Sequence, residues 1–292
     1  MVTNQLPTIG SVVVTGASSG IGEACALRLD KLGFRVFAGV RQEEDGTALQ
    51  SRASDRLTPI LLDVTDITSI TVAVDTVTTA VGETGLTGLV NNAGIVVAGP
   101  LEFLPITEIR KQFEVNIIGQ ITVTQAFLPL LRQGKGRIVN IGSLGGRIAM
   151  PFIGPYNASK FAMEAFTDSL RLELRPWNIH VSIIEPNFIA TPIWEKSKAT
   201  ADDILRNLPQ QVDHLYGTVI ATVRDSYSKV GKKGTPADEV AKTIVHALTV
   251  TRPKTRYVVG KGARIGSVVF TRLPDRLRDF LITWLLLRLF KR

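Results

Sequence analysis

The sequence predicts an α/β protein in which a doubly wound parallel sheet of about seven strands carries helices on both faces. Three observations favour this class. Short apolar runs, typical of strands buried on both faces, recur along the chain. They alternate with stretches that are long enough for the crossover helices that parallel strands require. Glycine and polar residues follow the runs, where sheets of this kind bind their ligands.

The strands are assigned in order along the chain. The apolar runs that we expect to be strands cover residues 11–14, 35–40, 57–62, 86–90, 137–141, 179–184 and 255–259. Helical patterns lie between them, and the clearest cover 23–32, 106–132 and 155–175. The residues that we expect at the carboxyl ends of strands are Gly16, Arg41, Asp63, Asn91, Ser143 and Pro186.

One domain, residues 1–292, is the preferred interpretation. The 292 residues, of which 45% are hydrophobic, suffice for a large core, and α/β sheets often run this long as one domain. We find neither an internal repeat nor a low-complexity linker. Two segments depart from the alternation of strands and helices. Residues 192–234 show no strand pattern, and residues 263–292 form a basic, apolar tail.

The net charge of +8 belongs mostly to the C-terminal end. Residues 261–292 hold eight Lys or Arg and two Asp, so they carry +6 of this charge. No nucleic-acid motif accompanies them, and we expect no nucleic-acid partner. The single cysteine, Cys25, excludes an internal disulfide and is compatible with a reducing compartment. No apolar leader precedes the first strand, so we expect a cytoplasmic protein.

Residues 15–22, Thr-Gly-Ala-Ser-Ser-Gly-Ile-Gly, form a glycine-rich turn between the first strand and a helix. Glycine lets the backbone approach a ligand, and the free N–H groups of a helix N-terminus face an anion, so this turn is a candidate pyrophosphate site. Its spacing is G-x-x-x-G-x-G rather than the general G-x-G-x-x-G. The residues expected to contact a nucleotide here are Gly16, Ser18, Ser19, Gly20, Ile21 and Gly22.

Tyr156 and Lys160 are one helical turn apart, thirteen residues after Ser143. Positions i and i+4 share a helix face, so both side chains can reach one cleft. The ammonium favours the phenolate and should lower a tyrosine pKa that is ordinarily about 10. Such a pair can move a proton on or off an alcohol oxygen, provided that another group moves the hydride.

Taken together, these residues resemble the short-chain dehydrogenase/reductase family over residues 8–260. The motifs that carry the resemblance are residues 15–22 (T-G-x-x-x-G-x-G), 91–94 (N-N-A-G), Asn116, Ser143, Tyr156-x-x-x-Lys160 and 186–191 (P-G-x-x-x-T). Asn187 departs from the last motif, because it replaces the glycine. Within the family, residues 38–41 and 175–179 look closest to the branch of hydroxysteroid and retinol dehydrogenases.

The resemblance implies a Rossmann fold and an oxidoreductase that transfers a hydride between a nicotinamide cofactor and a hydroxyl or carbonyl group. Tyr156 would be the general acid/base, and Ser143 would hold and polarise the substrate oxygen. Lys160 would also hydrogen-bond the nicotinamide ribose. Asn116, at a local kink in its helix, would complete a water relay to Lys160. The further cofactor contacts are expected from Asp63, Val64, Asn91, Ala93, Gly94, Ile189 and Thr191.

The end of the second strand favours NADP(H) over NAD(H). A dehydrogenase that selects NAD would carry a carboxylate there for the ribose 2′-hydroxyl, but the matching residue is Val40. Arg41 follows and can bind a 2′-phosphate, and Ser18 can add a hydroxyl contact. Against this, Ser19 stands where many NADP enzymes have a basic residue, and residues 43–45 are acidic. NAD(H) therefore stays open as the alternative.

The substrate is expected to be apolar. In the family, the segment at 192–234 forms a lid over the substrate, which suits a long segment without strands. The candidates for the cavity wall are Leu144, Arg147, Met150, Phe152, Ile153 and Trp194. They favour a lipid-like, steroid-like or retinoid-like alcohol or ketone without choosing among these. No metal site is predicted.

Two other functions stay open: a cofactor-binding regulator that has lost its chemistry, and a membrane-surface protein in which the tail matters more than catalysis. The longest apolar run of the tail, residues 280–287, is too short to span a bilayer. It could instead dock on a membrane surface or on another subunit. In the family, the helices at 106–132 and 155–175 pair between subunits, so we expect a homodimer or homotetramer.

Overall fold

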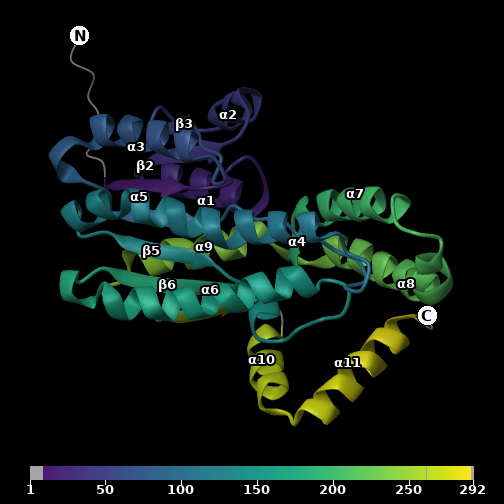
Figure 1. Ribbon diagram of the computed structural model, residues 1–292. Coiled ribbons are helices and arrows are strands. Elements are labelled where there is room, and N and C mark those ends of the chain that lie inside the picture. The colour runs from purple at the N-terminus through teal and green to yellow at the C-terminus, as the bar shows by residue number, and fades with distance from the viewer. Residues whose placement is uncertain (1–8, 261, 291–292) are drawn as a thin grey trace.

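A parallel sheet of seven strands, in the order β3-β2-β1-β4-β5-β6-β9, organises the fold (Figure 1). The structure is a computed structural model that describes residues 9–260 and 262–290, without the side chains of 223–233, 264–265 and 285–290. The strands are β1 (Ser11–Val14), β2 (Arg35–Val40), β3 (Leu57–Leu61), β4 (Gly88–Asn91), β5 (Arg137–Ile141), β6 (His180–Pro186) and β9 (Arg256–Val259). The predicted doubly wound α/β class is confirmed.

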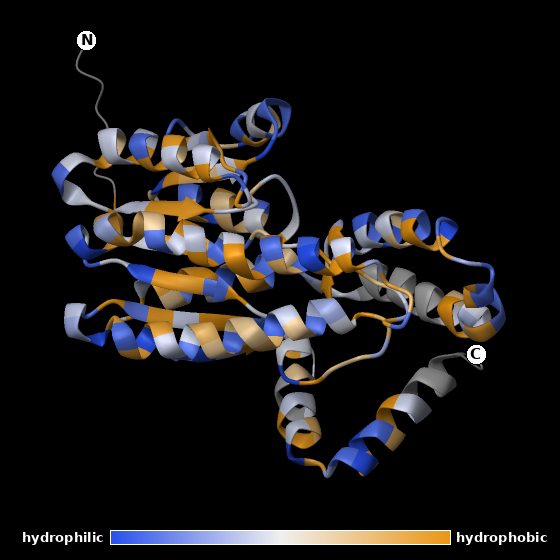
Figure 2. Ribbon diagram, in the orientation of Figure 1, coloured by the Kyte–Doolittle hydropathy of each residue, from blue (hydrophilic) through white to orange (hydrophobic). Residues whose placement is uncertain are grey.

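Helices cover both faces of this sheet, and α1 and α9 lie on the face opposite to α3, α5 and α6 (Figure 1). Side chains of β1 show how the two cores arise. Val12 and Val14 belong to the core under α1 and α9, whereas Val13 belongs to the core under α3 and α5, because successive strand residues face opposite ways. The helices of these two layers are α1 (Gly20–Lys31), α3 (Ile67–Val81), α5 (Gly119–Gln133), α6 (Gly154–Glu173) and α9 (Ala237–Thr249), with α2 (Glu43–Gln50) beside β2 and β3. Figure 2 shows the hydrophobic strands between them.

The strand bounds follow the apolar runs closely. β1, β2 and β5 coincide with the predicted residues, β3 and β9 differ by one residue at one end, and β4 and β6 differ by one or two residues at both ends. β4 begins at Gly88 rather than at residue 86 because the N–H of Leu86 donates to the main-chain oxygen of Leu130 in α5, at 2.9 Å. The chain at Leu86 is therefore held by a helix end and joins the sheet two residues later.

The long helical pattern at 106–132 contains an interruption. The structure has α4 (Ile106–Phe113) and α5, joined by a π-helical turn over Glu114–Ile118. Asn116 lies in this turn with its side chain fully buried. A π-turn widens the helix by one residue and is common at functional sites. The break that the resemblance implied at Asn116 is present.

The strand order also places the ligand crevice. β1 pairs with β2 on one side and with β4 on the other, so the chain winds away from β1 in both directions. In sheets of this kind ligands bind beyond the carboxyl ends of the strands at such a reversal. The glycine-rich turn follows β1, and the segment at 91–94 begins at the end of β4. Both motifs therefore meet at the crevice.

Two segments extend beyond the sheet. Residues 192–234 hold α7 (Ile193–Arg206) and α8 (Gln211–Lys233), and a short parallel pair that the sequence did not indicate, β7 (Ile189–Ala190) with β8 (Thr235–Pro236), closes their base. The tail forms α10 (Ala263–Arg272), which contacts β9, and α11 (Asp275–Phe290), which contacts α8 (Figure 1). Within the described residues, none of the helices combines the length and hydropathy that crossing a membrane requires.

Candidate active site

The first two turns of α6 bring Tyr156 and Lys160 together, as their spacing predicts. The Nζ atom of Lys160 lies 5.8 Å from the centre of the Tyr156 ring. It donates a 2.7 Å hydrogen bond to the main-chain oxygen of Ile141, the last residue of β5. Lys160 is buried and Tyr156 is half-buried. The helix thus presents a phenol and an amine at the carboxyl end of β5.

Ser143 lies just beyond β5, close enough to Tyr156 for its hydroxyl to lower the pKa of that phenol. Its Oγ atom also accepts the N–H of Gly145, at 3.0 Å, within the 3₁₀ turn Leu144–Gly146. Position 145 requires glycine, because a Cβ atom there would lie 2.7 Å from Nδ2 of Asn157 and 3.3 Å from the Tyr156 ring. The turn can therefore lie against α6 and bring the serine to the tyrosine.

The acid–base properties of this pair differ from the expectation in one respect. Loss of water around the phenol raises the pKa of Tyr156 above its ordinary value, and the hydrogen bond with Ser143 lowers it only in part. The predicted lowering by Lys160 is wrong for this geometry, because burial acts against the charged form of both groups. It lowers the pKa of Lys160 to about 8, although the carboxylate of Glu164 raises it.

Asn116 reaches the site through Ser159. Its Oδ1 atom accepts the N–H of Ile95 at 2.9 Å, and its Nδ2 atom donates to the oxygen of Ile95 at 3.1 Å. The same Nδ2 atom donates to Oγ of Ser159 at 3.1 Å. Asn116 therefore ties the π-turn to α6 beside Lys160. Sequence reasoning missed Ser159, although its place between Tyr156 and Lys160 could have drawn attention to it.

The turn between β1 and α1 fits the pyrophosphate of a dinucleotide. Gly16 and Gly20 have φ values of +63° and +64°, which favour glycine. A Cβ atom at Gly22 would lie 2.3 Å from the oxygen of Gly16, so the cradle also depends on this glycine. Thr191 packs on the other side, 3.1 Å from where a Cβ atom of Gly20 would be. The other predicted turn residues, Ser18, Ser19 and Ile21, are half-buried beside it.

Thr15 and Asn92, which sequence reasoning did not single out as contacts, bind the two sides of the crevice together. Oγ1 of Thr15 accepts the N–H groups of Asn92 and Ala93 at 2.9 and 3.0 Å. Nδ2 of Asn92 donates to the oxygens of Thr15 and Gly16, each at 3.0 Å. Ala93 and Gly94 are therefore held beside the glycine turn. Their motif letters were visible in the sequence, but these bonds across the crevice were not.

Asn91 uses its side chain inside the fold. Its Nδ2 atom donates to Oγ1 of Thr124 at 2.8 Å and to Oδ1 of Asn140 at 2.9 Å. These bonds join β4 to α5 and β5 in a buried position. The Asn91 side chain is therefore engaged inside the fold, and a contact of its main chain with the cofactor stays a prediction.

The end of β2 presents a cation rather than a carboxylate. Val40 is buried, and Arg41 directly after it is exposed. Asp63, beyond β3, is half-buried, and its Oδ1 atom accepts from the N–H and Oγ1 of Thr65 at 2.9 and 2.7 Å. Val64 next to it is buried. One carboxylate oxygen of Asp63 is thus engaged locally, which fixes the side chain at the rim of the crevice.

The segment after β6 keeps its position despite the asparagine. The backbone φ angle of Asn187 is not positive. The N–H of Asn187 donates to the main-chain oxygen of Val259 at 2.8 Å. The replacement of glycine therefore needs no unusual backbone conformation here. Ile189 follows in β7, and its main-chain oxygen accepts from Nε1 of Trp194 at 2.7 Å.

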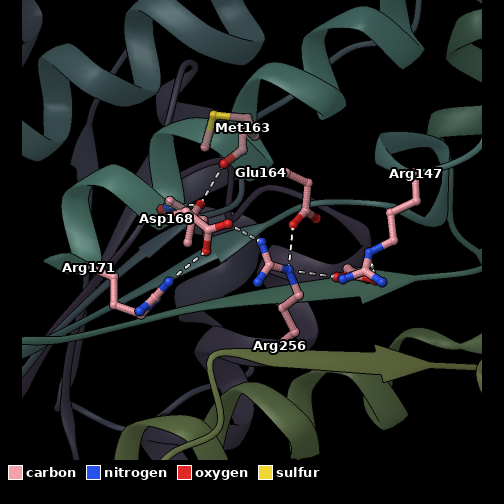
Figure 3. Close-up of polar contacts among 9 residues, drawn as sticks. Arg147, Met163, Glu164, Asp168, Arg171 and Arg256 are labelled. Atoms are coloured by element: carbon pink, nitrogen blue, oxygen red, sulfur yellow. Dashed lines mark hydrogen bonds and ion pairs between the residues drawn. The ribbon is translucent and has the colours of Figure 1, made fainter.

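Aromatic residues gather where the substrate is expected. The ring of Tyr216 on α8 makes edge contacts with Phe103 and Phe152, at 6.1 and 6.2 Å between ring centres. The rings of Trp194 on α7 and Phe188 are tilted against each other, with 5.9 Å between their centres. Of the other candidates for the cavity wall, Leu144 and Met150 are half-buried and Ile153 is buried. Arg147 is paired with Glu185 (Figure 3).

A family model described as short chain dehydrogenase matches residues 11–202. The chain belongs to the short-chain dehydrogenase family. Retinol dehydrogenase 5 of Mus musculus is 40% identical over 286 residues, which cover 95% of this chain and 89% of that protein. The 17-beta-hydroxysteroid dehydrogenase type 6 of Bos taurus is 39% identical over 280 residues, covering 93% and 87%. A short chain dehydrogenase from Burkholderia cenocepacia, solved in complex with NADP, matches with a TM-score of 0.69 at 25% identity, covering 92% of this chain and 95% of that one.

The resemblance and the branch predicted from the sequence are both confirmed. Membership of the short-chain dehydrogenase family makes the protein an oxidoreductase that acts on CH–OH groups with a nicotinamide cofactor. The glycine turn lies at the carboxyl end of β1 and Ser143 at the carboxyl end of β5, on the same edge of the sheet with β4 between them.

Proposed function

We propose that the protein is an NADP(H)-dependent oxidoreductase that interconverts the hydroxyl and carbonyl forms of an apolar alcohol or ketone. The observation that carries this proposal is the grouping of Ser143 and Tyr156 around Gly145, with buried Lys160 one helical turn from Tyr156. This pair lies at the same edge of the sheet as the glycine cradle. The single-domain arrangement with a lid at 192–234 is part of the proposal.

The residues would divide the work as follows. The bound cofactor supplies or accepts the hydride. Tyr156 donates its proton to the carbonyl oxygen during reduction and takes a proton from the alcohol during oxidation. Ser143 holds and polarises the same oxygen. With a pKa of about 8, Lys160 keeps its proton at neutral pH, and its charge would offset part of the burial that disfavours the phenolate of Tyr156. Asn116 orders the segment beside Lys160 and borders the water relay.

Arg41 supports NADP(H) as the preferred cofactor. Its guanidinium is exposed at the end of β2, where it can bind the 2′-phosphate, and buried Val40 offers no carboxylate to a 2′-hydroxyl. The related dehydrogenase from Burkholderia cenocepacia was solved with NADP. NAD(H) is the alternative, because the acidic residues 43–45 begin the next helix.

The substrate class follows from the apolar and aromatic residues near Tyr156. Relatives about 40% identical are named for retinol and for a hydroxysteroid, both of which are large, apolar alcohols. Phe152, Tyr216 and Trp194 could cover such a molecule. We therefore propose a lipid-like, steroid-like or retinoid-like substrate.

Two assembly properties belong to the same proposal. Exposed apolar residues on α10 and α11, flanked by arginines, would contact an anionic membrane surface: Val268, Val269, Leu277 and Phe280. Exposed Ile118, Phe161 and Phe166 would help to pair α5 and α6 between subunits of a dimer or tetramer. Light scattering that shows a strict monomer at micromolar concentration would contradict the second property.

The decisive experiment is turnover of the full chain with a panel of apolar ketones and alcohols, run with NADPH and with NADH. We expect reduction of at least one steroid-like or retinoid-like carbonyl compound, faster with NADPH. The Tyr156→Phe variant is the control for contaminating activity. Cofactor binding without turnover of any compound would favour the regulatory alternative.

A further inference from the structure

Six charged side chains form one network beneath the catalytic helix (Figure 3). Three are arginines and three are acids, so the formal charges balance. They come from the turn after Ser143, from α6, from β6 and from β9. The members are Arg147, Glu164, Asp168, Arg171, Glu185 and Arg256.

Glu185, near the end of β6, is the buried centre of one half of this network. Its side chain is fully buried. Its Oε2 atom lies 3.0 Å from Nε of Arg147, and its Oε1 atom lies 3.6 Å from Nε of Arg256. Arg256 continues to Glu164 on α6, at 2.9 Å, and to Asp168, at 2.5 Å. The negative charge of Glu185 is thus compensated by two arginines, of which Arg147 is the closer.

Arg147 is joined to Ser143 by a rigid turn of the main chain. The N–H of Gly146 donates to the oxygen of Ser143 at 2.9 Å, and the N–H of Arg147 donates to the oxygen of Leu144 at 3.0 Å. Gly146 lies directly on α6, because a Cβ atom there would be 2.8 Å from the main-chain oxygen of Lys160. A displacement of Arg147 would therefore move both Ser143 and the turn of α6 that carries Lys160.

The segment from Leu144 to Met150 is also held to α6 by the side chain of Asn157. Nδ2 of Asn157 donates to the oxygen of Gly145 at 2.9 Å, and Oδ1 of Asn157 accepts the N–H of Met150 at 2.9 Å. α6 thus holds the middle and the end of the segment. The pair between Arg147 and Glu185 adds the anchor to the sheet, which neither of these bonds supplies.

We propose that Arg147 is a positioning residue that, through its ion pair with Glu185, holds the Ser143 turn against α6 and keeps the Ser143 and Tyr156 hydroxyls aligned for proton transfer. This inference rests on the proposed function. It assigns to Arg147 an anchoring role in place of a contact with the substrate. The charged groups that face Glu185 are Arg147 from the turn, Arg256 from β9 and Glu164 from α6.

The test compares Arg147→Met with Arg171→Met in the full chain. The two arginines are matched, because their side chains are 32% and 31% exposed and each pairs at 3.0 Å with an acid of the same network. We expect kcat of Arg147→Met to fall roughly 10- to 100-fold, as for a misplaced reacting group. The dissociation constant of NADPH should stay within about twofold. Arg171→Met should keep kcat within about twofold, and Arg147→Lys should restore most of the loss.

A second variant covers the case in which unpaired Glu185 prevents folding, since an isolated buried carboxylate is strongly destabilising. Arg147→Met/Glu185→Gln removes both charges, so we expect a thermal midpoint close to that of the parent with kcat still reduced. Parent-like kcat in either variant, or equal losses in Arg147→Met and Arg171→Met, would overturn the proposal. A parent protein without turnover on any substrate would instead refute the proposed function.

Discussion

The proposed cofactor cradle and the proposed proton-transfer site lie at the same edge of the sheet but are built differently. The cradle is made of main chain, with Gly16 and Gly20 at positive φ and Gly22 too close to Gly16 for any side chain. The proton-transfer site is made of side chains, with Tyr156 beside Ser143 and Lys160 buried. A main-chain site fails when atoms are added, whereas a side-chain site fails when single atoms are removed or shifted.

The two regions are also held by different contacts. Thr15 and Asn92 join the cradle across the crevice by neutral hydrogen bonds. The proton-transfer site is supported by an ionic network under α6, in which Glu185 is the buried centre of one half. We therefore expect changes in one region to leave the other measurably intact, and the following variants test this separation from the largest effect to the smallest.

Tyr156→Phe should have the largest effect. It removes the phenol hydroxyl beside Ser143 and keeps the packing of the ring, so turnover should fall by roughly 10²–10⁴-fold. NADPH binding, measured by fluorescence titration, should match the parent, because the cradle lies on another element. A near-normal turnover number would remove Tyr156 from its role. Weakened NADPH binding would show instead that the two regions are not separable.

The ionic network around Glu185 should make the free energy of unfolding depend on pH. Burial raises the pKa of Glu185 from 4.5 to about 7, with Glu164 adding to the rise and the two arginines opposing it. The folded state then binds more protons than the unfolded state between these values, so this group's contribution to stability is lost as pH rises from about 4.5 to about 7. The loss should reach at most roughly 3 kcal/mol.

Urea unfolding of the parent and of Glu185→Gln across this pH range would measure that contribution. The parent should lose stability relative to the variant as pH rises, because glutamine has no proton to release. Parallel curves for the two proteins would mean that Glu185 titrates at its ordinary pH and that burial does not dominate its environment.

Arg41→Ala tests the cofactor region alone. Loss of a charged partner of the 2′-phosphate should cost about 1.5–3 kcal/mol, so the Michaelis constant for NADPH should rise roughly 10- to 100-fold. NADH lacks this phosphate and serves as the internal control, with little change expected. A similar loss with both cofactors would give Arg41 a structural role, and no loss with either would place the 2′-position elsewhere.

Deletion of residues 266–292 should have the smallest effect on both regions. Among the described residues, the main contacts of α10 and α11 are with β9 and α8, so kcat on a soluble substrate should change by less than about twofold. Flotation with anionic liposomes should weaken, or the oligomeric state should change. If neither differs from the full chain, the proposed role of the tail is wrong.

Much of the fold was predictable because it depends on local patterns. Apolar runs marked all seven strands of the sheet, since strands covered on both faces must be continuously apolar. The exceptions have tertiary causes. Leu86 bonds to α5 and not to a strand, and the two-residue pair β7–β8 is too short to leave a pattern.

The candidate site divides in the same way. Glycine spacing located the cradle, and the i, i+4 spacing located Tyr156 and Lys160, because both rules act within one or two turns of the chain. Other contacts of the site join distant residues. Asn116 bonds to Ser159, 43 positions away, and Thr15 bonds to Asn92, 77 positions away, so no local sequence pattern could predict them.

The sequence by itself determined the sheet, the nucleotide turn and the family, since these follow from hydrophobic periodicity and from short spacings. Only the tertiary structure decided the electrostatics of the site. Burial sets the direction in which the pKa values of Tyr156, Lys160 and Glu185 move, and burial is a property of the assembled core. The pairing of Arg147 with Glu185, 38 positions along the chain, likewise exists only because α6, β6 and the Ser143 turn meet in the folded protein.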